Sequence, residues 1–262
     1  MASETPALQP ITPAYHVRIL EDEQLDQLQS ATLEILEQVG IHCPSEKALR
    51  IYAEHGGVVD FTSGVVKIPR DVVLKAMSHA PRFYTMGARD PDFDLKLDGK
   101  SLFCATDGCG VETIDFSTRQ RRPSKKEDVA AMARMCDHLS AIGFYWPIVS
   151  AQDFPETAPL HELDASYNNT VKHVQSETVM GEIPARYAVE MAAVIAGSKD
   201  ELRKRSPFSL VVCTIAPLIQ DKEGIEGAMV LSRAQLDTKP LENVADLLKV
   251  LINNAAAMYR VG

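Results

Sequence analysis

The chain has 262 residues, of which 45% are hydrophobic and 24% are charged, and its formal net charge is −9. This composition is typical of a globular protein with room for one large domain or two small ones. The acidic balance argues against a nucleic-acid surface, because contacts to phosphates need a basic patch and the basic cluster RQRRPSKK at 119–126 is short. We interpret that cluster as the solvated entry to a helix.

The cysteines and the N-terminus indicate the compartment. Five cysteines, an odd number scattered along the chain, favour reduced thiols. The start, MASETPALQPITPAYH, lacks the basic and apolar regions of a signal peptide, and no apolar run reaches the roughly 20 residues that span a bilayer. We therefore expect a cytoplasmic protein without a membrane span.

Residues 20–120 predict an α+β N-terminal subdomain that follows a proline-rich, flexible arm at 1–19. A stripe of apolar residues from Asp22 to Val39 predicts an amphipathic helix that Gly40 ends. Ser45 is placed to cap a second, shorter helix.

A hairpin comes next, with its turn at Thr62-Ser63-Gly64, and Pro69 then leads a further helix. Between Arg82 and Asp115, four short β-like runs are separated by turn residues such as Asp98-Gly99. These runs predict one small antiparallel sheet.

Residues 121–236 alternate between helical and strand-like patterns, which predicts an α/β region with parallel strands and right-handed crossovers. A capping box of Ser124 and Glu127 predicts where its first helix begins. Strands and helices are then expected in alternation, at 142–149, 158–169, 171–177, 184–196, 208–215 and 222–234. Residues 237–262 predict a linker and one amphipathic helix.

Polar residues follow each of the three predicted strands: Gln152 and Asp153 the first, Glu177 the second and Thr214 the third. Catalytic and binding groups of parallel α/β folds lie where strands end. We therefore expect Asp153, Glu177 and Thr214 to meet at a common rim. The simpler interpretation is that the polar residues after each strand form an ordinary surface loop. The sequence leaves open whether these residues form a binding site or such loops.

Trp146, the single tryptophan of the chain, is either a core side chain or a ring that faces a pocket and a cationic ligand. His173 is expected to be a half-buried, hydrogen-bonded imidazole rather than a base. His161-Glu162 begins like a metalloprotease helix, but Ala165 stands where the second histidine is needed.

The run Asp107-Gly108-Cys109-Gly110 has the composition of a phosphate-binding loop, but a β-like segment follows it instead of a helix. We therefore expect a turn or a bulge there. Cys104 and Cys109 have no further ligands at zinc spacing nearby, so no metal site is predicted.

Four blocks of sequence, in the order given below, resemble the trimethylamine methyltransferase family. The enzymes of this family depend on a corrinoid, and the resemblance is to the type that lacks pyrrolysine. The blocks are EDEQLDQLQSATLEILEQVGI, IPRDVVLKAMSHAPRFYTMGARDP, TIDFSTRQRRPSKKEDVAAMARMCDHLSAIGF and VSAQDFP. The resemblance runs from about residue 20 to 233.

The resemblance implies a TIM barrel that moves a methyl group from a quaternary or tertiary methylated amine to the cobalt of a separate corrinoid protein. The corrinoid would be bound to that partner and not to this chain. On this interpretation the barrel-mouth residues that bind the amine are Trp146, Gln152, Asp153, Glu177 and Thr214. No catalytic residue is assigned.

Family members are nearly twice this length, and three βα units cannot close an eight-stranded barrel. The fold class is therefore predicted as partial TIM-barrel-like parallel βα units preceded by an α+β subdomain. The exposed edges of such a sheet must be covered by a partner chain, by the terminal helix or by the first subdomain. The chain is therefore expected to be a fragment, to assemble with another copy as a homo-oligomer, or to have lost catalysis. The alternative function is a truncated, non-catalytic paralogue that acts as a binding or interaction module.

Overall fold

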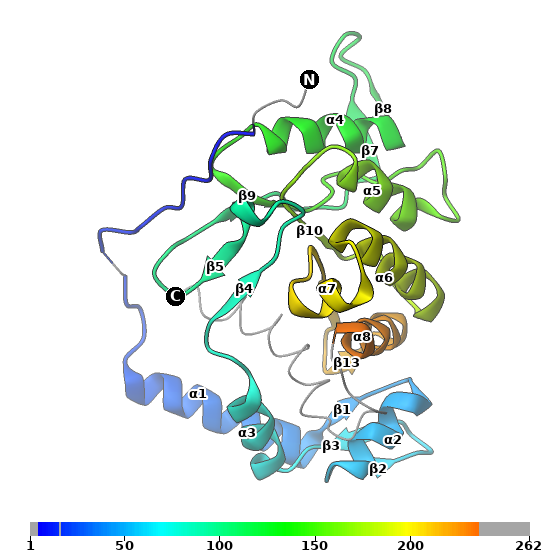
Figure 1. Cartoon of the computed structure of the whole chain (residues 1–262). Helices are drawn as coiled ribbons and strands as arrows, with labels where there is room; N and C mark the ends of the chain where they lie inside the picture. Colours follow the sequence, from blue (N-terminus) through cyan, green and yellow to red (C-terminus); the bar gives the residue numbers. More distant parts are fainter. Residues whose placement is uncertain (1–4, 16, 236–262) are drawn as a thin grey trace. The chain divides into compact units, whose positions relative to one another are not determined.

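The computed structural model describes residues 5–15 and 17–235 (Figure 1). The chain forms two compact units that interleave along the sequence. Unit 1 contains residues up to Pro13, Phe83–Val179 and Ile183–Val211, and unit 2 contains Ala14–Arg82, Met180–Glu182 and residues from Val212. The domain boundaries predicted at residues 20, 121 and 237 stay a prediction, because compactness alone does not define an independently folding domain. The linker and helix predicted at 237–262 lie outside the described residues.

Unit 1 is built on a four-stranded parallel sheet. Its strands, in spatial order, are β6 (Cys104–Ala105), β9 (Ile142–Tyr145), β10 (His173–Ser176) and β11 (Phe208–Leu210). His173 lies opposite Phe144, and Val174 lies between Tyr145 and Phe208. The prediction that the strands near 142, 171 and 208 are adjacent and parallel is confirmed. The sequence did not predict β6 as a fourth member.

Four helices belong mainly to unit 1: α4 (Lys126–Asp137), α5 (Ala158–Tyr167), α6 (Glu182–Ala196) and α7 (Lys199–Lys204). One face of α4 packs on the sheet through a core that contains Val129, Ala133 and Tyr145. The predicted capping box is one residue out of register, because Lys125 and Asp128 form it. The Ser124 hydroxyl instead donates to the carbonyl oxygen of Ser150 at 2.7 Å, which ties the start of α4 to the end of β9.

The predicted small antiparallel sheet is wrong in detail, because the runs between 82 and 115 form two separate pairs. β4 (Tyr84–Met86) pairs with β5 (Leu95–Leu97), with the short 3-10 helix η2 (Pro91–Phe93) between them. β7 (Glu112–Ile114) pairs with β8 (Arg121–Pro123). Part of the basic cluster is therefore a strand, because its residues pair across the hairpin with β7 before the helix begins.

Unit 2 confirms the predicted N-terminal elements. It contains α1 (Asp22–Glu34) continued by a π-helical turn η1 (Ile35–Val39), then β1 (Ile41–His42), α2 (Glu46–Glu54), β2 (Val58–Asp60), β3 (Val65–Lys67) and α3 (Arg70–His79). Gly40 ends the first helix at a φ of 84°, where a Cβ would lie 2.4 Å from the carbonyl oxygen of Val66. The Ser45 hydroxyl caps α2 as expected.

The sheet of unit 2 joins distant parts of the chain. Its order is β12 (Thr214–Ile215), β13 (Ile219–Gln220), β1, β3 and β2, and β1 runs parallel to β13. Helices α2 and α8 (Lys222–Gln235) contribute Leu49, Tyr52 and Met229 to the core beside this sheet. The strand predicted at 208–215 is therefore two strands in two different sheets.

The α/β class with parallel βα units is confirmed, whereas a closed barrel is not formed by residues 5–15 and 17–235. In the same part of the chain, no helix is both long and apolar enough to cross a membrane.

Candidate functional site

The carboxyl edge of the parallel sheet carries Trp146 and Glu177. Side chains alternate between the two faces of a strand, so Trp146 shares a face with Phe144, and Glu177 shares a face with His173. Phe144 and His173 are themselves neighbours, with ring centroids 6.3 Å apart in an edge-to-face arrangement. Continued one residue past β9 and β10, this alternation places Trp146 and Glu177 on one face, at the ends of adjacent strands, and their role in binding stays a prediction.

The backbone of Trp146 is held by β6. Its N–H donates to the Thr106 hydroxyl oxygen at 2.8 Å, and that hydroxyl donates back to the Trp146 carbonyl oxygen at 2.6 Å. The indole Nε1 is buried and has no hydrogen-bond partner among the described residues. Trp146 as a whole residue is half-buried, so part of it remains accessible.

Negative charge gathers around the loop that follows β6. The pKa of Glu177 is raised by burial and by the carboxylates of Asp107 and Glu162, although the Cys109 N–H donates to it. Burial, together with Glu162 and Glu177, raises the pKa of the Cys109 thiol to about 12. A cation placed here would relieve both effects, because an opposite charge favours the ionised carboxylate.

A buried polar network lies beneath this edge and is centred on Glu162 of α5, which is only 1% exposed. One carboxylate oxygen accepts from the Ser150 hydroxyl at 2.6 Å and from the Ala151 N–H at 3.3 Å. The other accepts from the Thr178 hydroxyl at 2.5 Å. Because Ser150 follows β9 and Thr178 follows β10, Glu162 fixes the two strand ends relative to each other.

The remaining predicted residues are placed differently. Gln152 is half-buried and donates through Nε2 to the Ser150 hydroxyl oxygen at 2.9 Å, so it belongs to the Glu162 network. Asp153 is exposed, and its carboxylate accepts from the Lys126 N–H at 2.8 Å, where it caps α4. Thr214 lies in β12 of unit 2 and is not part of the parallel sheet.

Sequence reasoning missed Asp107 and Glu162. The available signal for Glu162 was its place between Ala158 and Ala165, two residues on the buried face of α5, where a charged side chain must find partners. His173 fits the expectation of a satisfied imidazole, although it is fully buried. Its ring nitrogens lie 2.6 Å from the Gly87 carbonyl oxygen and 2.8 Å from the Ser209 hydroxyl oxygen.

A groove of about 380 Å³ lies between α4 and α5, but it is not the candidate site. Its lining includes the ion pairs of Lys126 with Asp164 at 2.5 Å and of Arg134 with Glu127 at 2.8 Å, so both of its basic side chains are already paired. Neither Trp146 nor Glu177 lines it. Within the described ranges, no group of three or more histidine, cysteine, aspartate or glutamate side chains is arranged to hold a metal ion.

Comparison with known proteins places this geometry in context. The family model for trimethylamine methyltransferase (MTTB) matches residues 2–238. Trimethylamine methyltransferase MttB of Desulfitobacterium hafniense (strain DSM 10664 / DCB-2) is 37% identical over 198 residues, which cover 75% of this chain and 40% of that protein. MttB of Methanosarcina barkeri (strain Fusaro / DSM 804) is 29% identical, over 77% of this chain and 42% of its own length.

A glycine betaine methyltransferase of Desulfitobacterium hafniense (strain Y51) is 25% identical over 228 residues, which cover 86% of this chain and 46% of that protein. The chain thus matches less than half the length of each of these three relatives, between 40% and 46%.

Proposed function

Because the chain belongs to the trimethylamine methyltransferase family, we propose that it takes part in moving a methyl group from a methylated amine to the cobalt of a corrinoid protein. The names of the relatives, which refer to trimethylamine and to glycine betaine, support a tertiary or quaternary amine as the donor. The observation that carries the proposal is that Asp107, Trp146 and Glu177 follow the carboxyl ends of three neighbouring parallel strands, β6, β9 and β10, and that the Asp107 carboxylate is near enough to raise the pKa of Glu177.

The proposed role of these residues is to bind and orient a cation. The exposed part of the Trp146 ring would face the methylated nitrogen, whose positive charge is attracted to an aromatic face. Glu177 and Asp107 would balance that charge. A quaternary ammonium departs as a neutral tertiary amine once it has lost a methyl group, and a tertiary amine bound in its protonated form departs as a neutral secondary amine. In both cases the donor is a cation, and no side chain needs to protonate the leaving group. Gln152 would line the same edge from the Glu162 network.

The corrinoid, carried by a separate protein, supplies the nucleophile when that protein is bound. Trp146 and Glu177 lie at strand ends and are half-buried, which supports an edge open enough for a partner to reach a bound amine. The task of the chain would be to hold one methyl group in line with the incoming partner.

The proposal includes the larger architecture. We place the four parallel strands in an eight-stranded barrel of the TIM type, completed by strands from outside the described residues or from a second copy of the chain. Asp153 stays a candidate substrate contact of the complete barrel, and the cytoplasm stays the expected compartment.

The alternative is a non-catalytic binding module. It is supported by the position of β6 and β11, which form the two edges of the parallel sheet within the described residues, where a partner chain could add a strand.

Trp146 allows a direct test of binding, because its fluorescence is the only tryptophan signal of the chain. Titration with tetramethylammonium should change this fluorescence saturably, and Glu177→Gln should weaken the apparent affinity about tenfold through loss of one charge pair. Glu156→Gln, which alters an exposed carboxylate in the loop before α5, is the matched control and should bind like wild type. No saturable signal, or equal effects of both variants, would count against the site.

Catalysis is tested separately. The full chain is mixed with cob(I)alamin and either trimethylamine or glycine betaine, and methylcobalamin formation is followed by absorbance. The proposal is supported if methyl transfer occurs with the wild-type chain and is slower with Glu177→Gln. A stable monomer that is inert toward both donors supports the non-catalytic alternative.

A further inference from the structure

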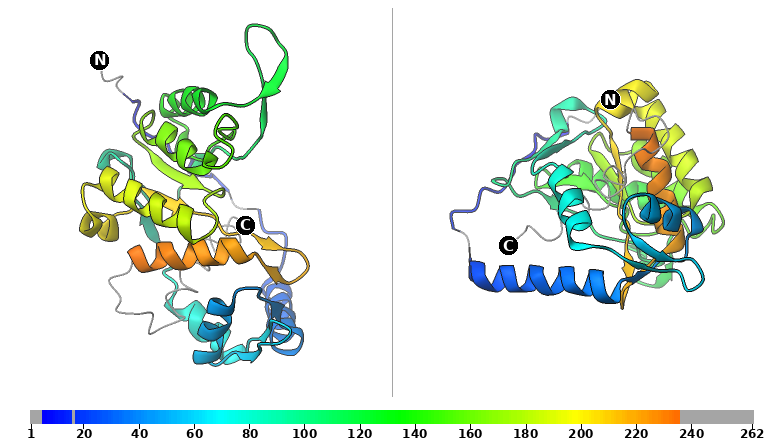
Figure 2. Two further views of the ribbon diagram at one scale, coloured as in Figure 1. Left: turned by 90° about the vertical axis from the view of Figure 1, so that its right-hand side faces the viewer. Right: turned by 90° about the horizontal axis from the view of Figure 1, so that it is seen from below.

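A structured hairpin extends from unit 1 beyond α4 and α5, and the proposed chemistry does not use it. It consists of β7, β8 and the turn between them, and both Figure 1 and the left view of Figure 2 show it projecting away from the neighbouring helices. We call residues 111–125 the β7–β8 hairpin.

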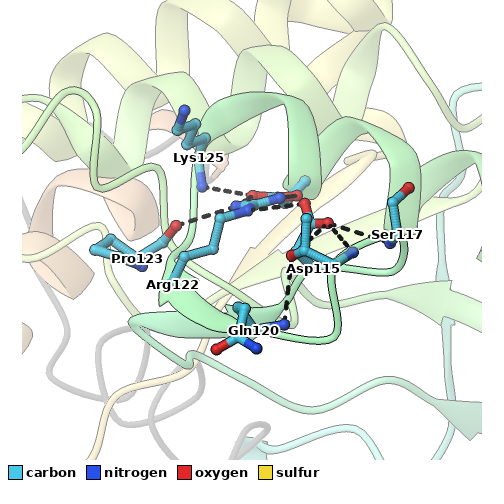
Figure 3. Close-up of polar contacts among 8 residues, drawn as sticks. Asp115, Ser117, Gln120, Arg122, Pro123 and Lys125 are labelled. Carbon is cyan, nitrogen blue, oxygen red and sulfur yellow. Dashed lines mark hydrogen bonds and ion pairs between the residues drawn. The ribbon is translucent and has the colours of Figure 1, made fainter.

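Internal hydrogen bonds give this hairpin a fixed shape (Figure 3). Near the tip, one carboxylate oxygen of Asp115 accepts from the N–H groups of Ser117 and Thr118, at 3.1 and 3.0 Å. At the stem, the Arg122 guanidinium makes two bonds to Asp128 of α4, at 2.7 and 2.8 Å, and one to Asp115 at 3.3 Å. The tip is therefore held in place by both the turn and the helix.

The hairpin presents apolar side chains to solvent. Phe116 is 80% exposed and Ile114 is 64% exposed. The Arg119 guanidinium carbon lies 4.8 Å from the centre of the Phe116 ring, so the tip combines an aromatic ring with a cation. Apolar groups held out in water by an ordered element mark interaction sites more often than isolated exposed residues do.

The charge of the hairpin is opposite to that of the chain. Residues 111–125 contain four basic and two acidic side chains, whereas the whole chain has a net charge of −9. Aromatic residues and arginine are also the types enriched at the centres of protein interfaces. A partner surface that complements the hairpin would have an apolar depression for the aromatic ring and acidic side chains around it.

The hairpin also starts at the candidate site. β6 leads into Asp107 and Cys109 beside Glu177, and the hairpin begins two residues after Cys109. The chain from Gly110 to Phe116, six steps of about 3.3 Å when extended, spans about 20 Å. A domain of about 100 residues has a radius of gyration near 13 Å, so a small domain seated on the tip can reach back to the site.

We propose that the β7–β8 hairpin docks the methyl-acceptor protein, with Phe116 entering an apolar depression and Arg119 and Arg121 facing acidic side chains around it. The identity of this partner as a corrinoid protein rests on the proposed function. A protein fits better than a small molecule, because the tip is a projection and not a cavity.

The test uses the full chain and a cobalamin-loaded corrinoid protein purified from Desulfitobacterium hafniense, the source of the 37% identical relative. Binding is measured by biolayer interferometry, and methyl transfer is measured with this protein and with free cob(I)alamin. Phe116→Ala and Arg119→Gln should each weaken binding, Phe116→Ala by about 30-fold if Phe116 is a central contact. Transfer to the corrinoid protein should fall in parallel, and transfer to free cob(I)alamin should not change.

Phe61→Ala is the matched control, since Phe61 is 56% exposed at the turn of the β2–β3 hairpin, and it should change nothing. Equal binding by wild type and Phe116→Ala overturns the proposal, as does a wild type that does not bind the corrinoid protein. Loss of a dimer in Phe116→Ala with unchanged corrinoid binding also overturns it and identifies a second copy as the occupant. Hairpin-dependent binding without transfer to either acceptor supports docking and refutes the proposed catalysis.

Discussion

Replacing Glu162 tests whether its network holds the ends of β9 and β10 together. The carboxylate is buried and accepts from the Ser150 hydroxyl, the Ala151 N–H and the Thr178 hydroxyl. Glu162→Leu removes every acceptor at similar side-chain size. Glu162→Gln keeps a carbonyl oxygen for Ser150 and Ala151 and turns its amide toward the Thr178 oxygen, which can accept.

The two variants should differ in cost. A buried donor without a partner costs about 1–3 kcal/mol. Glu162→Leu leaves two such donors, the Ser150 hydroxyl and the Ala151 N–H, because the half-buried Thr178 hydroxyl can turn to the Ser176 hydroxyl at 3.2 Å, and we set the total cost at about 3 kcal/mol. Glu162→Gln keeps the bonds but loses their charge-assisted part, which we set at about 1 kcal/mol. The difference of about 2 kcal/mol corresponds to roughly 30-fold in an opening equilibrium.

Amide hydrogen exchange on the full chain, followed by mass spectrometry, measures this opening at Ala151 and Thr178. Exchange should quicken about fivefold in Glu162→Gln and more than about 100-fold in Glu162→Leu. Glu156→Leu, in the exposed loop before α5, should leave both segments unchanged. Equal acceleration by Gln and Leu would show that the negative charge matters instead of the number of bonds, and no acceleration by Leu would refute the network.

Three further predictions concern neighbouring groups. Burial lowers the pKa of His173 from 6.5 to about 4. The unfolded chain therefore takes up the proton first, and the free energy of unfolding should fall by up to about 3 kcal/mol from pH 6.5 down to 4. Urea titrations at a series of pH values measure this free energy. If wild type and His173→Gln showed the same dependence on pH, the prediction would be contradicted. At pH 8, iodoacetamide should alkylate the exposed Cys104 well before Cys109, whose pKa of about 12 reflects burial and nearby carboxylates, and Glu177→Gln should speed Cys109. Mass spectrometry measures the alkylation rate of each cysteine, and equal rates for Cys104 and Cys109 would contradict the prediction. A Cβ at Gly108 would lie 1.9 Å from the Pro147 carbonyl oxygen, against a nearest contact of 3.5 Å at Gly110. Gly108→Ala should thus lower the free energy of unfolding by about 1–3 kcal/mol, and Gly110→Ala should lower it less. Thermal unfolding measures both, and equal losses in the two variants would refute the clash at Gly108.

The sequence predicted the helices and the order of the parallel strands well, because both depend on local periodicity. It overextended the first strand to residue 149, whereas β9 ends at Tyr145. Pro147 lacks the N–H that a central strand needs, which explains the early end. β6 was not assigned to the parallel sheet because a strand of two residues has no periodicity, and its partner lies almost 40 residues away at Ile142 and Phe144.

The candidate site was predicted only in part, for a related reason. Trp146 and Glu177 follow from strand ends and alternation, which are visible in sequence. Glu162 was missed because a charge on a helix usually faces water, and nothing local shows that Ser150 and Thr178 surround it. Thr214 was misplaced because its apolar run continues after Leu210, where the chain leaves one sheet for another.

The parallel pairing of β1 with β13 has a consequence for biosynthesis. His42 lies opposite Ile219, 177 positions further along the chain. At a translation rate of about 5–20 residues per second, β1 waits roughly 9–35 seconds on the ribosome for this neighbour. During that interval the side of β1 that later pairs with β13 carries open hydrogen-bonding groups, because β3 covers only the opposite side. The nascent chain therefore carries an exposed strand edge, which a chaperone can protect from misassembly.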